Sequence, residues 1–521
     1  MRTTGIALLV FVTLATVALV IITQTLPPAP LPANVPASEF SAERAIRHIQ
    51  VIATHPRVTL SPVYEAAADY VLAELENMGL ETETQRSRGF RNTIGWIRGN
   101  SSSDIVLLTA HLDSVPLAPG ATDDASGVAV LLETARAMMY GTPPRNTVMF
   151  LFTDAEETGY WGAKVFIDQY PLAPNVRVVI GFDAGGISGP DVPTATSANN
   201  GWLIRHLAQA QNSYISGSSA ISALATTRQD FTNAFRKAGF SGYAFSLYWD
   251  IRIHTPEDCL ENLNPSSIQH QGYHALSLAR YFGNLNQLTD TRESDAVYFS
   301  VLRLFVVNYS PMWAIAMAIA ITGIFSGVLA YGLKQKILSW RGIGYGAFVL
   351  LIGLMIAPLP EVTLGTWISG IASHVTDRSL KQPLRVSMIV MLTLALTMLW
   401  YYLARRIKNT SIPDLTIGAL LPMAMGMIGT AMAFPAISFA FTWPLLFSLL
   451  SNAVWLYSHA HQKNSILAVL GLLFSGAASI VIVGPSLLLG LFEPAQMWLT
   501  LVFLGVLCGF LVPLIHLQKL L

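Results

Sequence analysis

The sequence predicts an α/β domain with a mostly parallel mixed sheet and helices on both faces, followed by an all-α transmembrane domain. Of the 521 residues, 52% are hydrophobic and only 12% are charged. Residues 1–300 hold 19 Lys+Arg and 27 Asp+Glu, whereas residues 301–521 hold 12 and 4. Short apolar runs alternate with helical patterns between residues 40 and 285. An entirely soluble protein is therefore excluded, and a nucleic-acid binder is excluded because the polar half is acidic.

Charge-free windows locate the membrane spans, because a spanning helix needs about 20 apolar residues. The windows cover residues 5–22, 304–333, 342–360, 386–404, 415–462, 464–492 and 494–518. Window 415–462 is too long for one crossing, and Pro435 and Pro444 predict a break into two helices. We therefore expect eight spans.

The positive charges predict the orientation of these spans. Every second connection is basic. Arg2 precedes the first span; Lys334, Lys336 and Arg341 follow the second, Arg405, Arg406 and Lys408 the fourth, Lys463 the sixth and Lys519 the eighth. The positive-inside rule then places both termini in the cytoplasm and the polar domain outside it, in a periplasm, an extracellular space or a lumen. The loop 361–385, assigned to the outer side, runs against this trend because it also holds basic residues.

We expect four parts along the chain. Residues 1–25 are read as an uncleaved signal anchor, with a cleaved signal peptide as the alternative. Residues 26–37 contain five prolines and are read as an extended tether. Residues 38–295 form the α/β domain, and residues 300–521 form the multi-pass transmembrane domain of about seven helices.

Buried strands are predicted for residues 105–110, 147–153, 176–182 and 243–248. Helices are predicted for residues 126–140, 201–211 and 265–282, and Ser61-Pro62 is a typical helix start. Continuous apolar strands that alternate with helices indicate a parallel sheet that is covered on both faces. Ligands of such sheets bind beyond the carboxyl ends of the strands.

Polar side chains stand at these strand ends. They are His111 and Asp113, Asp123 and Asp124 in the next loop, Glu156 and Glu157, Asp183, and His254. Imidazole and carboxylate groups without thiolates suit zinc or a similar divalent metal in a catalytic site that keeps open positions.

Four segments carry a resemblance to a known family: AHLDSVPLAPGATDDASGVAVLLE, FLFTDAEETGYWGAKVF, VIGFDAGG and IHTPEDCLENL. They resemble the metal-site motifs of the M28 family of zinc aminopeptidases over about residues 40–285. A peptidase domain followed by many spans is similar to the endoplasmic-reticulum metallopeptidases and vacuolar membrane proteases of that family.

The resemblance implies two zinc ions bridged by Asp123, with His111 and Asp183 on one ion and Glu157 and His254 on the other. Asp113 would orient His111, and Glu156 would be the general base that takes a proton from the attacking water. It also implies a cis peptide bond between Asp123 and Asp124.

One residue departs from the family pattern. The family often has asparagine two residues before the third-strand aspartate, where this chain has Gly181. This leaves a detail around Asp183 in doubt, but not Asp183 as a ligand.

The sequence therefore predicts a membrane-bound zinc exopeptidase, an aminopeptidase, which acts on peptides and contacts membrane lipid but not nucleic acid. Two alternatives stay open. A glutaminyl-cyclase-like enzyme would share the fold but use one zinc ion, and a transporter or receptor would carry an outer domain without activity. The presence of both His111 and Asp183 favours two metals, and the scarcity of ionisable residues in the spans gives transport little support.

Overall fold

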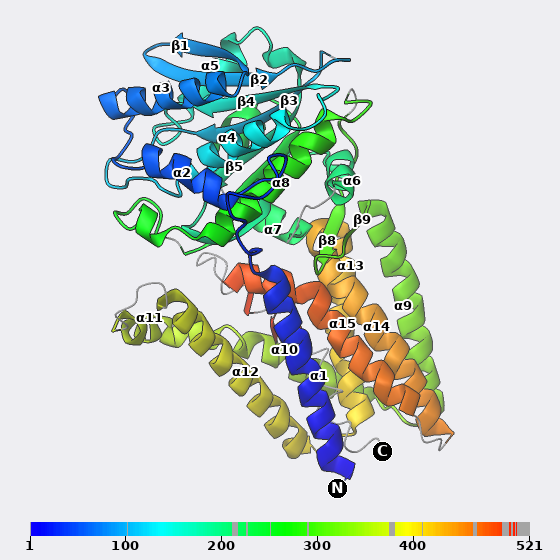
Figure 1. The fold of residues 1–521 in the computed structure, drawn as a ribbon. Helices are drawn as coiled ribbons and strands as arrows, with labels where there is room; N and C mark the ends of the chain where they lie inside the picture. Colours follow the sequence, from blue (N-terminus) through cyan, green and yellow to red (C-terminus); the bar gives the residue numbers. More distant parts are fainter. Residues whose placement is uncertain are drawn as a thin grey trace. The chain divides into compact units, whose positions relative to one another are not determined.

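We describe a computed structural model of the chain (Figure 1). It describes residues 2–491 apart from 102, 211–216, 226–227, 251, 289–290, 375–380, 409 and 462–465, and residues 500–501, 504–505 and 507. The chain divides into two compact units. The α/β unit comprises residues 26–217 and 221–296, and the helical unit comprises residues 1–25, 218–220 and 297–521.

The α/β unit is built on a seven-stranded sheet with the order β1-β2-β4-β3-β5-β7-β6. The strands are β1 (Glu81–Ser87), β2 (Phe90–Ile97), β3 (Ile105–His111), β4 (Thr147–Thr153), β5 (Val176–Ala184), β6 (Ser188–Thr196) and β7 (Gly242–Trp249). The four central strands β4, β3, β5 and β7 are parallel, whereas β2 and β6 pair antiparallel with the two sides of this core. The predicted mostly parallel mixed sheet is confirmed, and the central strands are the four that were predicted.

Helices cover both faces of this sheet (Figure 1). The α/β unit contains α2 (Ala42–Ile52), α3 (Pro62–Asn77), α4 (Ala125–Met139), α5 (Trp161–Gln169), α6 (Gly201–Gln209) and α8 (Pro265–Gly283). Helices α2, α4 and α8 pack on one another. On the opposite face, Phe166 of α5 and Phe231 and Phe235 of a π-helical turn pack in one core with Leu107 and Leu151. Side chains of a strand alternate between faces, so both faces of β3 and β4 are buried.

The proline-rich segment belongs to the α/β unit and is held on its surface. The Leu31 amide donates to the Gln269 side chain at 2.9 Å. The Arg44 guanidinium donates to the carbonyl oxygens of Ala33, Val35 and Glu39. These contacts from α2 and α8 tie down most of a segment that the sequence predicts to be a tether.

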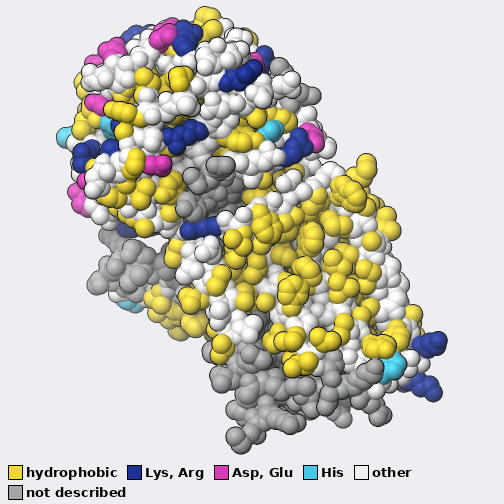
Figure 2. Space-filling model, turned by 45° about the vertical axis from the view of Figure 1, so that its right-hand side comes forward, with side chains coloured by type: hydrophobic (Ala, Val, Ile, Leu, Met, Phe, Trp, Pro, Cys, Tyr) yellow, Lys and Arg dark blue, Asp and Glu magenta, His cyan; other side chains and the backbone are white. Residues whose placement is uncertain are grey.

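The helical unit contains α1 (Arg2–Thr25), α9 (Pro311–Lys334), α10 (Trp340–Ile356), α11 (Leu359–Ser373), α12 (Lys381–Lys408), α13 (Ile412–Ala433), α14 (Pro435–Ala460) and α15 (Ile466–Leu491). Among the described residues, six helical stretches are long and apolar enough to cross a membrane, and α10 and α11 together count as one. On the face that Figure 2 shows, hydrophobic side chains are spread widely over the helical unit. The chain is a multi-pass membrane protein. The predicted span 494–518 lies largely outside the described residues.

Three details of the predicted spans are different in the structure. Residues 304–309 do not begin a span, because β9 (Phe305–Tyr309) pairs with β8 (Val297–Val301) and the helix starts at Pro311. The break in the window 415–462 falls at Pro435 as predicted, but Pro444 lies inside α14. Residues 361–373 belong to α11 rather than to a loop.

The misplaced loop has a physical cause. A charge-free window ends at Glu361, yet this carboxylate forms an ion pair with Arg385 of α12. Glu361 lies in the first turn of α11, so a single paired charge ends the charge-free window without ending the helical region.

Candidate metal centre

The order of the strands brings the predicted residues to one edge of the sheet. β4, β3, β5 and β7 are parallel neighbours, so their carboxyl ends lie side by side. His111 ends β3 and Asp183 lies one residue from the end of β5. Glu156 and Glu157 follow β4, and His254 follows β7. These largely apolar strands thus place histidine and carboxylate side chains where each strand leaves the core.

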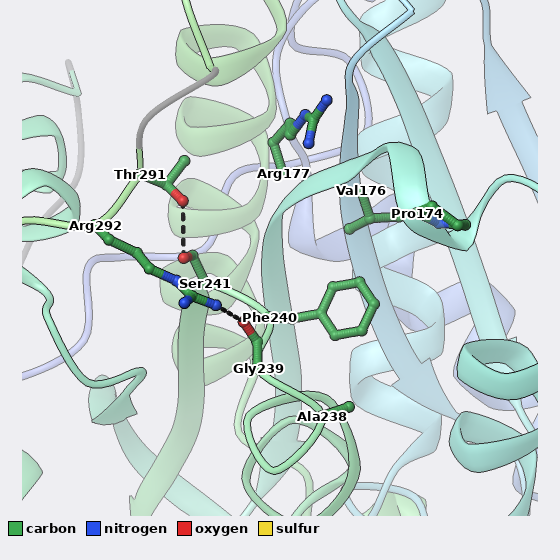
Figure 3. A pocket seen from close by; sticks show the side chains of 9 residues that line it. All are labelled: Pro174, Val176, Arg177, Ala238, Gly239, Phe240, Ser241, Thr291 and Arg292. Carbon is green, nitrogen blue, oxygen red and sulfur yellow. Dashed lines mark hydrogen bonds between the residues drawn. The ribbon is translucent and has the colours of Figure 1, made fainter.

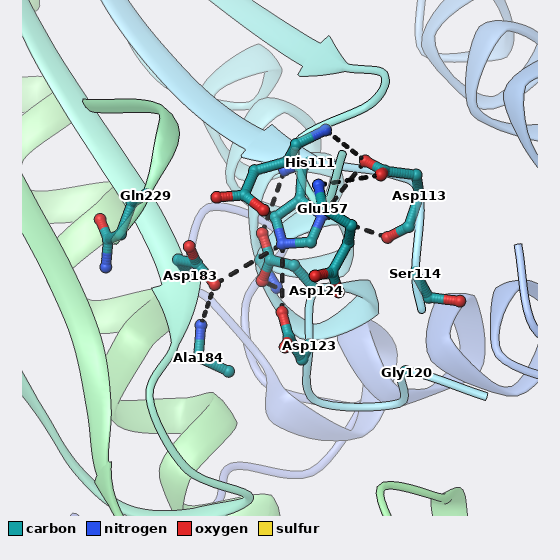
Figure 4. A network of polar contacts seen from close by, with 12 residues as sticks. His111, Asp113, Ser114, Gly120, Asp123, Asp124, Glu157, Asp183, Ala184 and Gln229 are labelled. Atoms are coloured by element: carbon teal, nitrogen blue, oxygen red, sulfur yellow. Dashed lines mark hydrogen bonds and ion pairs between the residues drawn. The ribbon is translucent and has the colours of Figure 1, made fainter. Parts of the chain in front are cut away.

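Asp123 lies between two histidines, His111 and His254. Figure 4 shows His111 beside Asp123. Its Oδ1 is 3.1 Å from Nε2 of His111, and its Oδ2 is 2.9 Å from Nε2 of His254. A second carboxylate accompanies each histidine, because Asp183 Oδ1 lies 3.6 Å from His111 Nε2 and Glu157 Oε2 lies 3.3 Å from His254 Nε2. Asp123 is therefore shared by two groups, one made of His111 and Asp183 and the other of His254 and Glu157.

The neighbouring Asp124 also lies close to this centre. It forms a group with His111 and Asp183 whose ligand atoms lie within 4.8 Å of one another, as do those of Asp123, Glu157 and His254. However, Asp124 Oδ2 accepts the His111 backbone N–H at 3.1 Å, and its Oδ1 accepts that of Gly127 at 3.0 Å. The buried Asp124 carboxylate thus caps α4 and fixes the start of the helix. The peptide bond between Asp123 and Asp124 is cis, as the resemblance implies.

Asp113 connects two parts of the centre. Its Oδ1 lies 3.4 Å from Nδ1 of His111, and its carbonyl oxygen lies 3.1 Å from the same nitrogen. Its carboxylate also accepts the backbone N–H groups of Glu156 and Glu157 at 3.0 and 3.2 Å. Asp113 therefore fixes the ring of His111 and the turn that follows β4.

Glu156 lies at the inner wall of the centre and is 7% exposed. Burial raises the pKa of its carboxyl group well above the usual range, and the nearby His111 opposes this effect. A carboxylate with a raised pKa can both accept and return a proton near neutral pH. Its neighbour Glu157 belongs to the histidine-containing group around Asp123, so the two adjacent glutamates occupy different environments.

The residues present fit a divalent cation. The donor set is imidazole and carboxylate, which is the set that zinc takes in catalytic sites. Burial, together with the nearby charge of Asp123, raises the pKa of Asp183 to about 6, although His111 opposes this shift. Glu157 Oε1 is buried and has no hydrogen-bond partner among the described residues. A cation would compensate for both the crowded negative charge and the unpaired oxygen.

Several buried polar residues lie around the centre that the sequence analysis does not identify. Arg57 and Asp258 contact the loop that carries Asp123. Asp230 accepts a hydrogen bond from Thr153 at the end of β4, and burial raises its pKa to about 7. Only Asp258 lies in a segment that carries the resemblance, so for the others the sequence pattern offers no signal.

The side chain of Gln229 lies near Gly181, the position that departs from the family pattern. A Cβ atom at position 181 would lie 3.0 Å from Cβ of Phe231 and 3.8 Å from Oε1 of Gln229. The Gln229 amide nitrogen donates to the carbonyl oxygen of Phe245 on the neighbouring strand. An amide side chain from a different part of the chain therefore lies near position 181. Figure 4 shows Gln229 on the Asp183 side of the centre.

A pocket of about 320 Å³ lies at the other end of the strands (Figure 3). Val176 at the start of β5 and Ser241 just before β7 line it, together with Phe240. Its two guanidinium groups are engaged, since Arg177 pairs with Asp104 at 2.8 Å and Arg292 donates to the carbonyl oxygen of Gly239. This pocket is separate from the centre around Asp123.

Comparison with known proteins decides the family of the α/β unit. The model of "Peptidase family M28" matches residues 92–279, which include every residue of the centre except Arg57. This region is a peptidase M28 domain. The M28 resemblance and the fold class predicted from the sequence are thereby confirmed.

The M28 domain has relatives among membrane proteases. Endoplasmic reticulum metallopeptidase 1 of Rattus norvegicus is 30% identical over 223 residues, which are 39% of this chain and 24% of that protein. Vacuolar membrane protease of Candida dubliniensis is 27% identical over 284 residues, 50% of this chain and 28% of that protein. The match thus spans about a quarter of the length of these relatives.

A solved structure also aligns with the M28 domain. The aminopeptidase from Aneurinibacillus sp. strain AM-1 is 16% identical with a TM-score of 0.41, over 50% of this chain and 99% of that chain.

Proposed function

We propose that the protein is a membrane-bound zinc exopeptidase, an aminopeptidase, that holds two zinc ions in its M28 domain. One observation carries this proposal. The two carboxylate oxygens of Asp123 face two different histidines, at 3.1 and 2.9 Å, and a further carboxylate accompanies each histidine. A shared aspartate between two such groups is the arrangement of a two-metal site, in which both ions act on one reacting group.

The ligands fall into two sets under this proposal. His111 and Asp183 would hold one ion, Glu157 and His254 the other, and Asp123 both. When bound, the ions would polarise the scissile carbonyl and stabilise the negative charge that develops on its oxygen. Asp113 would keep His111 in the tautomer that leaves Nε2 free for the metal, because it lies against Nδ1.

Glu156 would be the general base. Its carboxylate would take a proton from the attacking water and deliver it to the departing amine. The turn that carries it is fixed by the hydrogen bonds from the Glu156 and Glu157 amides to Asp113, which supports a constant position of the base relative to His111.

We infer that the M28 domain lies outside the cytoplasm and that the helical unit contacts lipid. The basic residues that follow α9 and end α12 support this orientation. A reporter enzyme that is active only in the cytoplasm, fused after Lys408, should be active. A silent reporter at this position would reverse the orientation.

The activity is tested on the full-length protein in detergent. Peptides with a free amino terminus should lose their first residue, whereas the same peptides with an acetylated amino terminus should remain intact. Equal cleavage of both sets would contradict an aminopeptidase. Release of ammonia from a peptide that begins with glutamine, without peptide-bond cleavage, would favour the cyclase.

The metal content is tested on the same preparation. Elemental analysis should give two zinc ions per chain. A single tightly bound ion with full activity would favour the one-metal arrangement. A folded protein that binds no zinc and cleaves no peptide would favour a transporter or receptor with an inactive outer domain.

A further inference from the structure

The loop Leu112–Asp123 has no helix or strand, yet it carries the residue that both metal groups share. It runs from the end of β3 to the start of α4 and is buried over much of its length. A loop of this kind needs partners for its backbone groups, because an unpaired buried N–H or C=O group is costly. The partners of these groups therefore determine where Asp123 lies.

Arg57 binds the carbonyl groups of this loop. The side chain is fully buried, with 0% exposure. Its Nε donates to the carbonyl oxygen of Leu112 at 2.7 Å, Nη1 to that of Pro119 at 2.5 Å and Nη2 to that of Gly120 at 3.0 Å. Its backbone amide donates to Ser114 Oγ at 2.8 Å. One guanidinium group thus ties both ends of the loop together.

Asp258 binds the amide groups at the end of the same loop. Its Oδ1 accepts the Thr122 N–H at 2.7 Å, and its Oδ2 accepts the Asp123 N–H at 3.0 Å. Its carbonyl oxygen also accepts the N–H of Ala121 at 3.2 Å. The side chain is 0% exposed, so water does not compete for these bonds.

The two residues match the loop in charge. The Arg57 guanidinium donates to carbonyl oxygens of the loop, and the Asp258 carboxylate accepts hydrogen bonds from its amide groups, so each meets the complementary end of the peptide dipoles. Arg57 also counteracts the crowded negative charge, because Asp113, Asp123, Asp124 and Asp258 all act on its guanidinium electrostatically. Both partners in each of these contacts belong to the protein, so the contacts do not require a metal ion.

Asp258 also couples the loop to the second histidine. It lies four residues after His254, and its own N–H donates to the carbonyl oxygen of Thr255 at 3.0 Å. The short segment between them therefore sets the separation of Asp123 from His254. A shift of Asp258 would change both members of one metal group.

We propose that Arg57 and Asp258 are positioning residues that hold the loop Leu112–Asp123 in its metal-binding conformation before any metal arrives. The proposal rests on the proposed two-metal function but makes its own claim. The protein, and not the ion, would order the loop. Gly120 is part of the arrangement, since it has a φ of +63° and a Cβ atom there would lie 3.1 Å from Nη2 of Arg57 and 2.3 Å from the carbonyl oxygen of Asp123.

Conservative variants test the contacts. Asp258→Asn keeps the shape but places an NH₂ group against one of the two amides, and Arg57→Lys keeps the charge but loses the planar fork. Partners that orient metal ligands typically contribute about 10–100-fold to metal affinity. We expect a loss of zinc affinity in this range for both variants, and a changed absorption spectrum of the cobalt-substituted protein.

Arg44→Lys is the matched control. Arg44 is also a largely buried guanidinium that donates to backbone carbonyl groups, but it lies on α2 and pairs with Glu133. This variant should lower the melting temperature without changing zinc affinity or the cobalt spectrum. If Arg57→Lys and Asp258→Asn behave like Arg44→Lys, the proposal is wrong.

Hydrogen exchange on the wild-type protein tests directly whether the loop is ordered before metal binds. In the full-length, metal-free protein, the amides of Thr122 and Asp123 should already be protected, and zinc should add little. Rapid exchange that slows only with zinc would mean that the metal orders the loop, which would overturn the proposal. The two proposals can fail separately. A wild-type protein that cleaves no peptide would contradict the proposed function, yet it could still show this protection of Thr122 and Asp123.

Discussion

Replacing Glu156 with glutamine should remove most of the peptidase activity while the protein keeps its metal. The change preserves the shape of the side chain and removes only the proton acceptor. A positioned general base contributes about 10²–10⁴-fold to the rate. With 7% exposure, Glu156 leaves little room for bulk water to replace it, so we expect the upper half of this range, about 10³–10⁴-fold. This corresponds to about 4–5.5 kcal/mol at 1.36 kcal/mol per decade.

Stability should not fall in this variant. Burial penalises the charged form of Glu156, so the neutral glutamine avoids a desolvation cost. The assay is peptide hydrolysis beside zinc content and melting temperature, all on the full-length protein. Near-normal turnover would refute the assignment of the base.

The variant Glu157→Gln tests the different role of the adjacent glutamate. Its Oε2 lies 3.3 Å from His254 Nε2, in one of the two candidate metal groups. We expect weaker zinc binding and partial recovery of turnover as zinc is added. If Glu156→Gln lost its metal and Glu157→Gln kept it, the roles of the two glutamates would have to be exchanged.

Three further outcomes are expected. The carboxylates of Asp123 and Glu157 raise the pKa of His254 to about 10, so this ring carries a proton at pH 7 in the metal-free protein. Zinc binding should therefore release protons, which calorimetry in buffers of different ionisation enthalpy would measure. Gly272→Ala, favourable in most helices, should lower the melting temperature, because the new methyl would lie 2.1 Å from the Phe40 ring and overpacking costs about 1–3 kcal/mol. Arg385→Met should destabilise the protein by about 3–5 kcal/mol, because Glu361 loses its partner, and adding Glu361→Gln should recover part of this loss. A double variant that is less stable than Arg385→Met alone would contradict this prediction.

The sequence predicts the sheet and the centre well for one physical reason. Strands that are buried on both faces must be largely apolar, so histidines and carboxylates appear where a strand ends. His111 and Asp183 stand out for this reason, and the structure brings them to 3.6 Å from each other. The roles of the ligands remain proposals, but their proximity follows from the strand order.

The remainder depends on contacts that a linear pattern does not contain. β9 lies inside a charge-free window that reads as a span, and its pairing with Val297–Val301 is what shows Phe305–Tyr309 to be a strand. Glu361 ends a charge-free window, although Arg385 compensates for it. Arg57 has no periodic or motif context, and its role becomes visible only when the carbonyl groups around it are known.

Gly181 also bears on the transfer of side chains between relatives of this domain. An asparagine at position 181 would have its Cβ 3.0 Å from that of Phe231, whereas Oε1 of Gln229 would lie in ordinary contact at 3.8 Å. To admit the new side chain, the segment that carries Phe231 must shift by a few tenths of an ångström. How well this site accepts the asparagine therefore depends on how easily that segment moves.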